Sequence, residues 1–301
     1  MLTRFYILLL TLCLGLPAAA SPLPFKISDE THTYWYYIQF DRNQYDATYG
    51  GNTEYLKHHP LVGYNGATPA EGTELYATQI SLVEDNMWKV EQGSASNSYK
   101  LRNKKSGLYL YYSGGVYKLS ETATEIMLPE STNSGFSNSY EICVATLTTT
   151  DGVTTASAQA GTYMNPQGGS LAGKKLTGYS QGDGGNFLSF VPANLSDANL
   201  TYSYYHFSNM GRGILYDDGT ATDAVPAAAT VKEAGEVAEA DLGCKWALYL
   251  KLLLVSDRGN YLTLDGEQVK VTPLGSNTEP LRLVSDANTY NGSATRTEFV
   301  I

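Results

Sequence analysis

The sequence contains one series of strand and turn signals twice, in the same order, and this duplication limits what the chain can fold into. Four pairs of segments align: 34–40 with 202–207, 87–90 with 245–248, 101–110 with 254–262, and 124–128 with 278–283. Isolated coincidences would not preserve their order along the chain. The duplication predicts two related units.

Short apolar or aromatic runs alternate with turn signals through most of the chain. Ser113-Gly114-Gly115 and Asp265-Gly266 each lie between two strand-like runs, and Gly-Gly and Asp-Gly are strong hairpin signals. The best helical candidate, Ala227 to Leu242, is interrupted by Thr, Val and Gly, so it is interpreted as turns and short strands. These patterns predict an all-β chain.

The N-terminus has the pattern of a secretory signal peptide. Arg4 precedes the apolar run Phe5 to Leu16, which is too short to span a bilayer, and Ala18-Ala19-Ala20 supplies small residues for cleavage after Ala20. We expect an exported protein that is secreted, periplasmic or at the cell surface. The predicted organisation is a signal peptide (1–20), a linker (21–33), a first domain (34–193), a linker (194–200) and a second domain (201–301).

Charge and cysteine usage exclude several classes of protein. Twenty Lys and Arg against thirty Asp and Glu give a net charge of -10 without a basic stripe, which argues against nucleic-acid binding. We expect no membrane-spanning segment. Cys143 and Cys244 remain after cleavage and are interpreted as small buried hydrophobic residues, although pairing between them stays open.

Two motifs resemble metal sites but lack the necessary partners. Asp217-Asp218-Gly219 with Asp223 does not have the alternating spacing and closing Glu of a calcium loop, so a turn is expected. His58-His59 has no His or Cys cluster to complete a zinc site. We expect no metal and no cofactor.

The segment from Tyr163 to Phe190 is the most recognisable in the chain. It carries Asn165, a Gly-rich loop, an aromatic residue at Tyr179 and a polar turn that ends at Asn186 before an apolar strand. This order resembles one repeat of the ricin B-type β-trefoil lectins, a family found in secreted or cell-surface bacterial proteins. The Gln-x-Trp of that family is replaced by Asn186-Phe187-Leu188.

The resemblance implies tandem β-trefoil-like domains, the second lacking one repeat, in a non-catalytic, monomeric protein that binds a glycan or polysaccharide. The implied carbohydrate-binding residues are Asn165, Gln167, Tyr179 and Asn186. Amides hydrogen-bond sugar hydroxyls, and an aromatic face covers the C–H surface of the ring. In the alternative interpretation, Tyr179 fills the core and the asparagines cap turns.

Two other functions compete with carbohydrate binding. The unequal second copy favours a structural or protein-interaction module of a cell-surface assembly. Gly178-Tyr179-Ser180-Gln181-Gly182 matches the G-x-S-x-G motif of serine hydrolases, with Ser180 as the nucleophile. That motif needs a helix directly after the serine, and the glycines at 182, 184 and 185 disfavour one, so we expect no enzyme.

Overall fold

The computed structural model describes residues 23–42, 59–197, 204–222, 227–232, 238, 241–285 and 299–300. Short gaps fall within these ranges, at 24, 67, 137, 170–171, 210–212, 252, 267, 275, 277–279 and 282–283. The predicted signal peptide lies outside the described residues, and the domain boundaries given above stay predictions.

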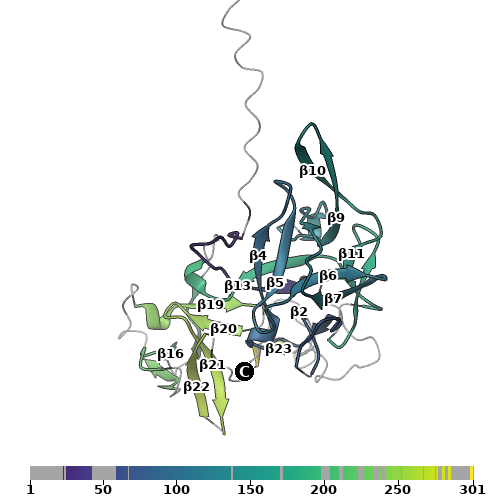
Figure 1. Cartoon of the computed structure of the whole chain (residues 1–301). Coiled ribbons are helices and arrows are strands. Elements are labelled where there is room, and N and C mark those ends of the chain that lie inside the picture. Colours follow the sequence, from purple (N-terminus) through teal and green to yellow (C-terminus); the bar gives the residue numbers. More distant parts are fainter. Residues whose placement is uncertain are drawn as a thin grey trace, which may run out of the picture.

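The described residues form strands and short 3₁₀ turns and contain no α-helix, which confirms the all-β expectation (Figure 1). No described helix is long and apolar enough to cross a membrane. The strands of the first unit are β1 (Tyr36–Phe40), β2 (Leu61–Gly63), β3 (Tyr76–Thr78), β4 (Met87–Gln92), β5 (Tyr99–Asn103), β6 (Tyr109–Ser113), β7 (Val116–Ser120), β8 (Ile126–Met127), β9 (Cys143–Thr150), β10 (Val153–Ala158), β11 (Tyr163–Pro166), β12 (Leu176–Tyr179) and β13 (Leu188–Pro192).

The first unit closes into a barrel of antiparallel strands. Strand β1 pairs with β4, β4 with β5, β5 with β8 and β8 with β9. Tyr140, just before β9, bridges to Leu188 of β13, and β13 returns to β1 with Tyr36 opposite Pro192. Because the first and last strands pair, the barrel has no open edge.

Three hairpins, β2–β3, β6–β7 and β11–β12, meet beside this barrel. They contact each other in pairs through Glu74 with Lys118, Tyr76 with Lys175, and Val116 with Thr177. Each repeat thus contributes a barrel strand, a hairpin and a second barrel strand. Three such repeats form a β-trefoil, the fold that the sequence resemblance implied. Strands β9 and β10 extend from the third repeat as an additional hairpin (Figure 1).

Alternating side chains of the barrel strands fill its core. Strand β1 is buried on both faces, with Tyr36, Ile38 and Phe40 in the barrel core. Trp88 of β4 is fully buried in the same core and donates from Nε1 to the carbonyl of Val62 at 2.8 Å. The predicted Gly114-Gly115 turn is confirmed, and both glycines have positive φ, as the tight turn between β6 and β7 requires.

The second unit repeats these pairings. Its elements are β14 (Tyr204–Tyr205), β15 (Ser208–Asn209), β16 (Gly213–Tyr216), β17 (Ala227–Ala228), β18 (Thr230–Lys232), β19 (Trp246–Tyr249), β20 (Leu253–Ser256), β21 (Asn260–Asp265), β22 (Gln268–Pro273), β23 (Val284–Ser285) and β24 (Phe299–Val300). Strands β14, β19, β20, β21 and β22 pair in succession, as β1, β4, β5, β6 and β7 do. Trp246 Nε1 donates to the carbonyl of Leu215, matching the bond from Trp88 to Val62. Within its described residues, the second unit supplies the pairings of two repeats.

One part of the sequence alignment is out of register. The amide of Leu281 donates to the carbonyl of Leu262, and the equivalent bond in the first unit runs from Thr124 to Leu110. Leu281 therefore corresponds to Thr124. The alignment of 124–128 with 278–283 placed Thr278 there, three residues earlier. The segment is short and offers few anchor residues, so its sequence alone does not fix its register.

The two units share a buried cluster that joins the outer face of the first barrel to the β19–β20 turn. Tyr37, Leu61 and Met87 pack there with Tyr249, Leu250 and other residues of the second unit. Gln39 donates from Nε2 to the carbonyl of Leu250 at 2.9 Å, and the Lys251 ammonium forms an ion pair with the Asp41 carboxylate. Cys143 and Cys244 are buried and unpaired, one in each unit, so the structure contains no bridge between them.

Candidate functional site

A pocket of about 470 Å³ lies beside the β11–β12 hairpin of the third repeat. In this hairpin Tyr163 pairs with Tyr179, and Asn165 pairs with Thr177. Because side chains alternate along a strand, Thr177 and Tyr179 lie on the same face of β12. The pocket is lined by Arg42, Asn165, Gln167, Gly168, Gly169, Thr177, Tyr179, Asp183 and Gly185.

A tight turn after β12 holds the acidic side of the pocket. The amide of Gly185 donates to Asp183 Oδ1 at 2.8 Å, and the amide of Asn186 donates to the Asp183 carbonyl at 2.9 Å. Asn165 Nδ2 also donates to Asp183 Oδ1, at 3.0 Å. The turn formed by Asp-Gly-Gly-Asn therefore brings the Asp183 carboxylate against Asn165 of β11, eighteen residues earlier in the chain.

A buried relay of hydrogen bonds supports Asn165 from behind. Asn165 Nδ2 donates to Asn186 Oδ1 at 2.8 Å, and Asn186 Nδ2 donates to Glu141 Oε1 at 2.8 Å and to the carbonyl of Ser180 at 2.7 Å. Glu141 and Asn186 are both buried. Both Nδ2 hydrogens of Asn165 are thus used inside the protein, and no described residue donates to its Oδ1.

The pocket combines an aromatic surface with acceptor oxygens to which no described residue donates a hydrogen bond. Tyr179 is 53% exposed although it lies in a strand, and a large exposed aromatic beside a polar pocket is suited to binding. Within the described residues, Asp183 Oδ2 and Asn165 Oδ1 accept no hydrogen bond. A pocket of this size falls in the usual range of about 300–1,000 Å³ for small-molecule sites.

The structure brings the four sequence-predicted site residues together but gives them different places. Asn165, Gln167 and Tyr179 line the pocket, whereas Asn186 is fully buried behind Asn165. Sequence reasoning missed Arg42, Thr177 and Asp183. Asp183 could have been found from its spacing before Gly185, which is typical of a side-chain-closed turn. No local signal places Arg42 here, because it comes from the first repeat.

Ser180 does not have the surroundings of a serine nucleophile. It follows β12 and enters the turn that contains Gly182, and the described residues directly after it form turns and strand β13 instead of an α-helix. His206, the one histidine after Ser180 in the sequence, lies in the second unit with Nε2 3.4 Å from Cys244 Sγ. The nucleophile elbow requires a strand, a sharp turn and a helix, and this segment lacks the helix.

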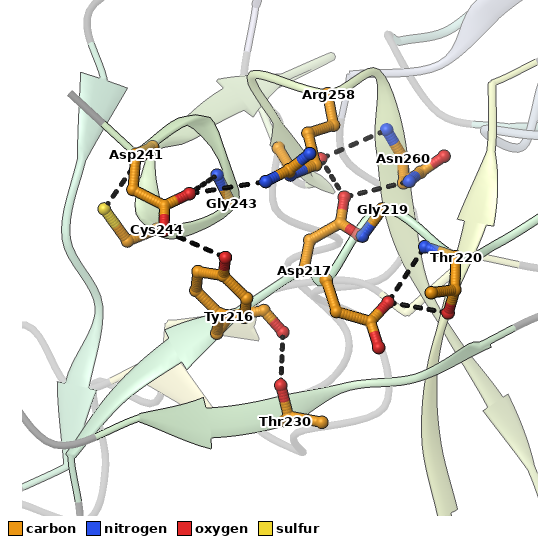
Figure 2. Close-up of polar contacts among 12 residues, drawn as sticks. Tyr216, Asp217, Gly219, Thr220, Thr230, Asp241, Gly243, Cys244, Arg258 and Asn260 are labelled. Atoms are coloured by element: carbon orange, nitrogen blue, oxygen red, sulfur yellow. Dashed lines mark hydrogen bonds and ion pairs between the residues drawn. The ribbon is translucent and has the colours of Figure 1, made fainter. Parts of the chain in front are cut away.

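The second unit contains a related turn whose polar groups are satisfied internally. The amide of Gly243 donates to Asp241 Oδ1 at 3.0 Å, as that of Gly185 does to Asp183 (Figure 2). Tyr216 and Arg258 also bind the Asp241 carboxylate, at 2.9 and 3.4 Å. The bonds from Gly243 and then Tyr216 lower the pKa of Asp241. This second turn thus has its own cation in contact with the aspartate.

Asp217 of the second unit is buried, and both of its carboxylate oxygens accept hydrogen bonds (Figure 2). Its Oδ2 accepts from Ser256 Oγ at 2.6 Å and from Asn260 Nδ2 at 2.9 Å, and its Oδ1 accepts from the amide of Gly219. Asp218 closes a second turn by accepting from Thr220. The turn expected at Asp217-Asp218-Gly219 is confirmed, and no group of three metal-binding side chains is found in the described part of the chain.

Gly185 is required for the close packing of the turn against Asn165. A Cβ at this position would lie 2.7 Å from Asn165 Nδ2 and 3.2 Å from Asp183 Oδ1. We expect Gly185→Ala to lower the free energy of unfolding by about 1–3 kcal/mol, the usual cost of overpacking. Denaturant unfolding measures this change. Gly135→Ala is the control, because a Cβ at that position would lie no closer than 3.3 Å to another atom, Asn133 Oδ1. Equal losses of stability in the two variants would contradict the expectation.

No protein-family model matches the sequence, and no curated protein matches it. Among solved structures, a mosquitocidal holotoxin is 11% identical with a TM-score of 0.42 over 85% of this chain, which spans 29% of that toxin. The Rhizoctonia solani agglutinin is 14% identical (TM-score 0.38; 56% of this chain, 99% of that one). The Macrolepiota procera ricin B-like lectin, solved with lactose, is 12% identical (TM-score 0.33; 52% and 93%).

These likenesses are low in identity, and their TM-scores are below 0.5. The fold assignment is therefore drawn from the strand pairings of this chain. Those pairings close a barrel, join three hairpins beside it and repeat in part in the second unit. The chain is an all-β protein whose first unit is a β-trefoil and whose structural neighbours include ricin B-like lectins.

Proposed function

We propose that the protein binds a carbohydrate, without catalysis, through the pocket of the third repeat. The observation that carries this proposal is the combination of the exposed Tyr179 ring with the acceptor oxygens of Asn165 and Asp183, all lining one pocket. A sugar presents a C–H face and a set of hydroxyl groups, and these two surfaces match an aromatic ring beside fixed acceptors.

The relay behind the pocket supports binding by fixing its acceptors in advance. Asn165 is held by Asp183 and Asn186, and Asn186 is held in turn by Glu141. A ligand that meets preorganised groups loses less free energy to side-chain ordering when it binds. In this proposal Tyr179, Asn165, Gln167 and Asp183 contact the sugar, while Asn186 supports Asn165 without touching the ligand.

The N-terminal segment extends the proposal to the location of the protein. We propose that residues 1–20 direct export and that the remaining chain acts outside the inner membrane as a monomer. Cell fractionation and the mass of the mature protein test the first point, since cleavage after Ala20 removes twenty residues.

Tyr179→Ala tests carbohydrate binding with little risk to the fold. A glycan array first identifies a bound sugar, and titration then measures its affinity. Losing the ring contact is expected to cost about 1–2 kcal/mol of binding, on the order of a tenfold weaker affinity. The thermal melt should stay unchanged because the ring is mostly exposed.

Tyr205→Ala is the matched control. Tyr205 is 56% exposed and lies in β14 of the second unit, so its removal should leave both affinity and melting unchanged. Asn165→Ala is less clean because Asn165 is 8% exposed and bridges Asp183 to Asn186, so its loss also affects stability. Unchanged affinity in Tyr179→Ala would place the sugar site elsewhere.

A further inference from the structure

Arg42 reaches the pocket from a different repeat than its other lining residues. It directly follows Asp41 at the end of β1, in the first repeat, whereas Asn165 to Gly185 belong to the third. A Cβ added to Gly184 would lie 3.3 Å from Arg42 Nη1. The guanidinium therefore lies along the same turn that holds Asp183.

The backbone that carries Arg42 is fixed by its neighbour. The amide of Asp41 donates to the carbonyl of Phe187, and its buried carboxylate accepts from the hydroxyls of Ser139 and Ser189. Lys251 of the second unit completes the set with an ion pair to Asp41. Arg42 is thus presented from a rigid strand end, which both units of the protein support.

Among the described residues, none neutralises the guanidinium of Arg42. No hydrogen bond or ion pair joins it to another described residue, and Asp183, on the same pocket wall, is not within ion-pair distance. By contrast, Arg258 forms an ion pair with Asp241 at 3.4 Å, and Arg102 Nε donates to the carbonyl of Gly107. The related turn in the second unit therefore has a paired cation, whereas the cation of the pocket has no partner among the residues that the structure describes.

We propose that the pocket selects an acidic sugar, one that carries a carboxylate, with Arg42 as the residue that determines this specificity. The inference rests on the proposed carbohydrate binding and names its ligand class. A guanidinium is always charged and presents a planar fork of donors that matches a carboxylate with two parallel hydrogen bonds. Asp183 Oδ2 and Asn165 Oδ1 accept from hydroxyls, so one ligand that carries both kinds of group satisfies the pocket.

The overall charge of the protein does not favour an acidic ligand, so this selectivity has to come from contacts inside the pocket. The net charge is -10, so the long-range field opposes the approach of an anion. Preference for an acidic sugar then depends on direct contact with Arg42. We expect it to persist at about 0.15 M salt, where the Debye length is about 8 Å.

The test compares acidic sugars with their neutral counterparts on the full protein by calorimetric titration. The pairs are glucuronic acid with glucose and galacturonic acid with galactose, and N-acetylneuraminic acid is added as a third acid. At least one acid should bind roughly ten- to hundredfold more tightly than the neutral sugars, as expected for charge-assisted hydrogen bonds. Arg42→Gln should remove this difference, so that the acid binds no more tightly than its neutral counterpart.

Arg258→Gln is the matched control, because it removes the same charge from a guanidinium that Asp241 already pairs. It should retain the preference for the acid. Equal binding of acid and neutral sugars, unaffected by Arg42→Gln, would overturn the specificity and leave carbohydrate binding intact. If no sugar binds here or on the glycan array, the proposed function fails and this inference fails with it.

Discussion

Trp88→Ala is expected to lower the free energy of unfolding by about 3–5 kcal/mol, the range typical of a buried aromatic residue truncated to alanine. Trp88 is fully buried in the barrel core and donates from Nε1 to the carbonyl of Val62. Truncation leaves a cavity between strands and removes the partner of a buried carbonyl. Both effects act on the barrel that positions the pocket.

Urea unfolding measures this loss. It is followed by far-UV circular dichroism instead of tryptophan fluorescence, because the variant lacks one of the three tryptophans. Trp35→Ala is the comparison: Trp35 is partly buried against the cluster between the units and should cost less. Trp246→Ala, at the equivalent position of the second unit, should approach the Trp88 value. A loss below about 1 kcal/mol for Trp88→Ala would contradict the assigned core.

Local turn chemistry and repeated motifs were sufficient to predict the all-β class and the two hairpins at Gly114-Gly115 and Asp265-Gly266. The Gly-Gly and Asp-Gly signals lie in hairpins, and the aligned segments around Trp88 and Trp246 have matching strand partners and matching Nε1 bonds. These features depend on neighbours within a few residues or on a strand pair nearby. Short-range sequence patterns describe such features well.

The β19–β20 turn shows where local signals are insufficient. Leu250 and Lys251 both have positive φ, a conformation that favours Gly, Asn or Asp, so nothing in their sequence indicates a tight turn. Contacts with the first unit compensate: Leu250 is buried beside Tyr37 and Leu61, and Lys251 is paired with Asp41. Tertiary packing selects this backbone, and a sequence pattern cannot reveal the partner surface.

The pocket, too, contains residues that the sequence could indicate and residues that it could not. The resemblance indicated Asn165, Gln167 and Tyr179, which come from one hairpin. It could not distinguish the buried Asn186 from a ligand contact, because both roles need an amide at that spacing. Arg42 was missed, since only closure of the barrel brings the end of β1 to the third repeat.

Glu141→Leu is expected to disassemble the pocket from behind. Glu141 Oε1 accepts from the amide of Gly182 at 2.8 Å and from Asn186 Nδ2 at 2.8 Å. Leucine has a similar volume but no acceptor. Asn186 is buried, and a buried donor that loses its partner costs about 1–3 kcal/mol. Asn186 would keep only its bond to the carbonyl of Ser180, so it would hold Asn165 less firmly. We expect lower stability in urea unfolding and loss of binding to any sugar found on the array.

Two effects oppose each other in this variant, and their sizes decide the outcome. Removing a buried carboxylate relieves its desolvation, which alone can stabilise a protein. That gain is realised when all partners of the charge are replaced together, whereas Glu141→Leu removes the acceptor of the Gly182 amide and of one Nδ2 hydrogen of Asn186. Glu141→Gln separates the two effects because it removes the charge and keeps an acceptor oxygen. It should bind sugar and unfold within about 1 kcal/mol of the parent. If the leucine variant matches the glutamine variant in both measurements, then the relay does not support the pocket.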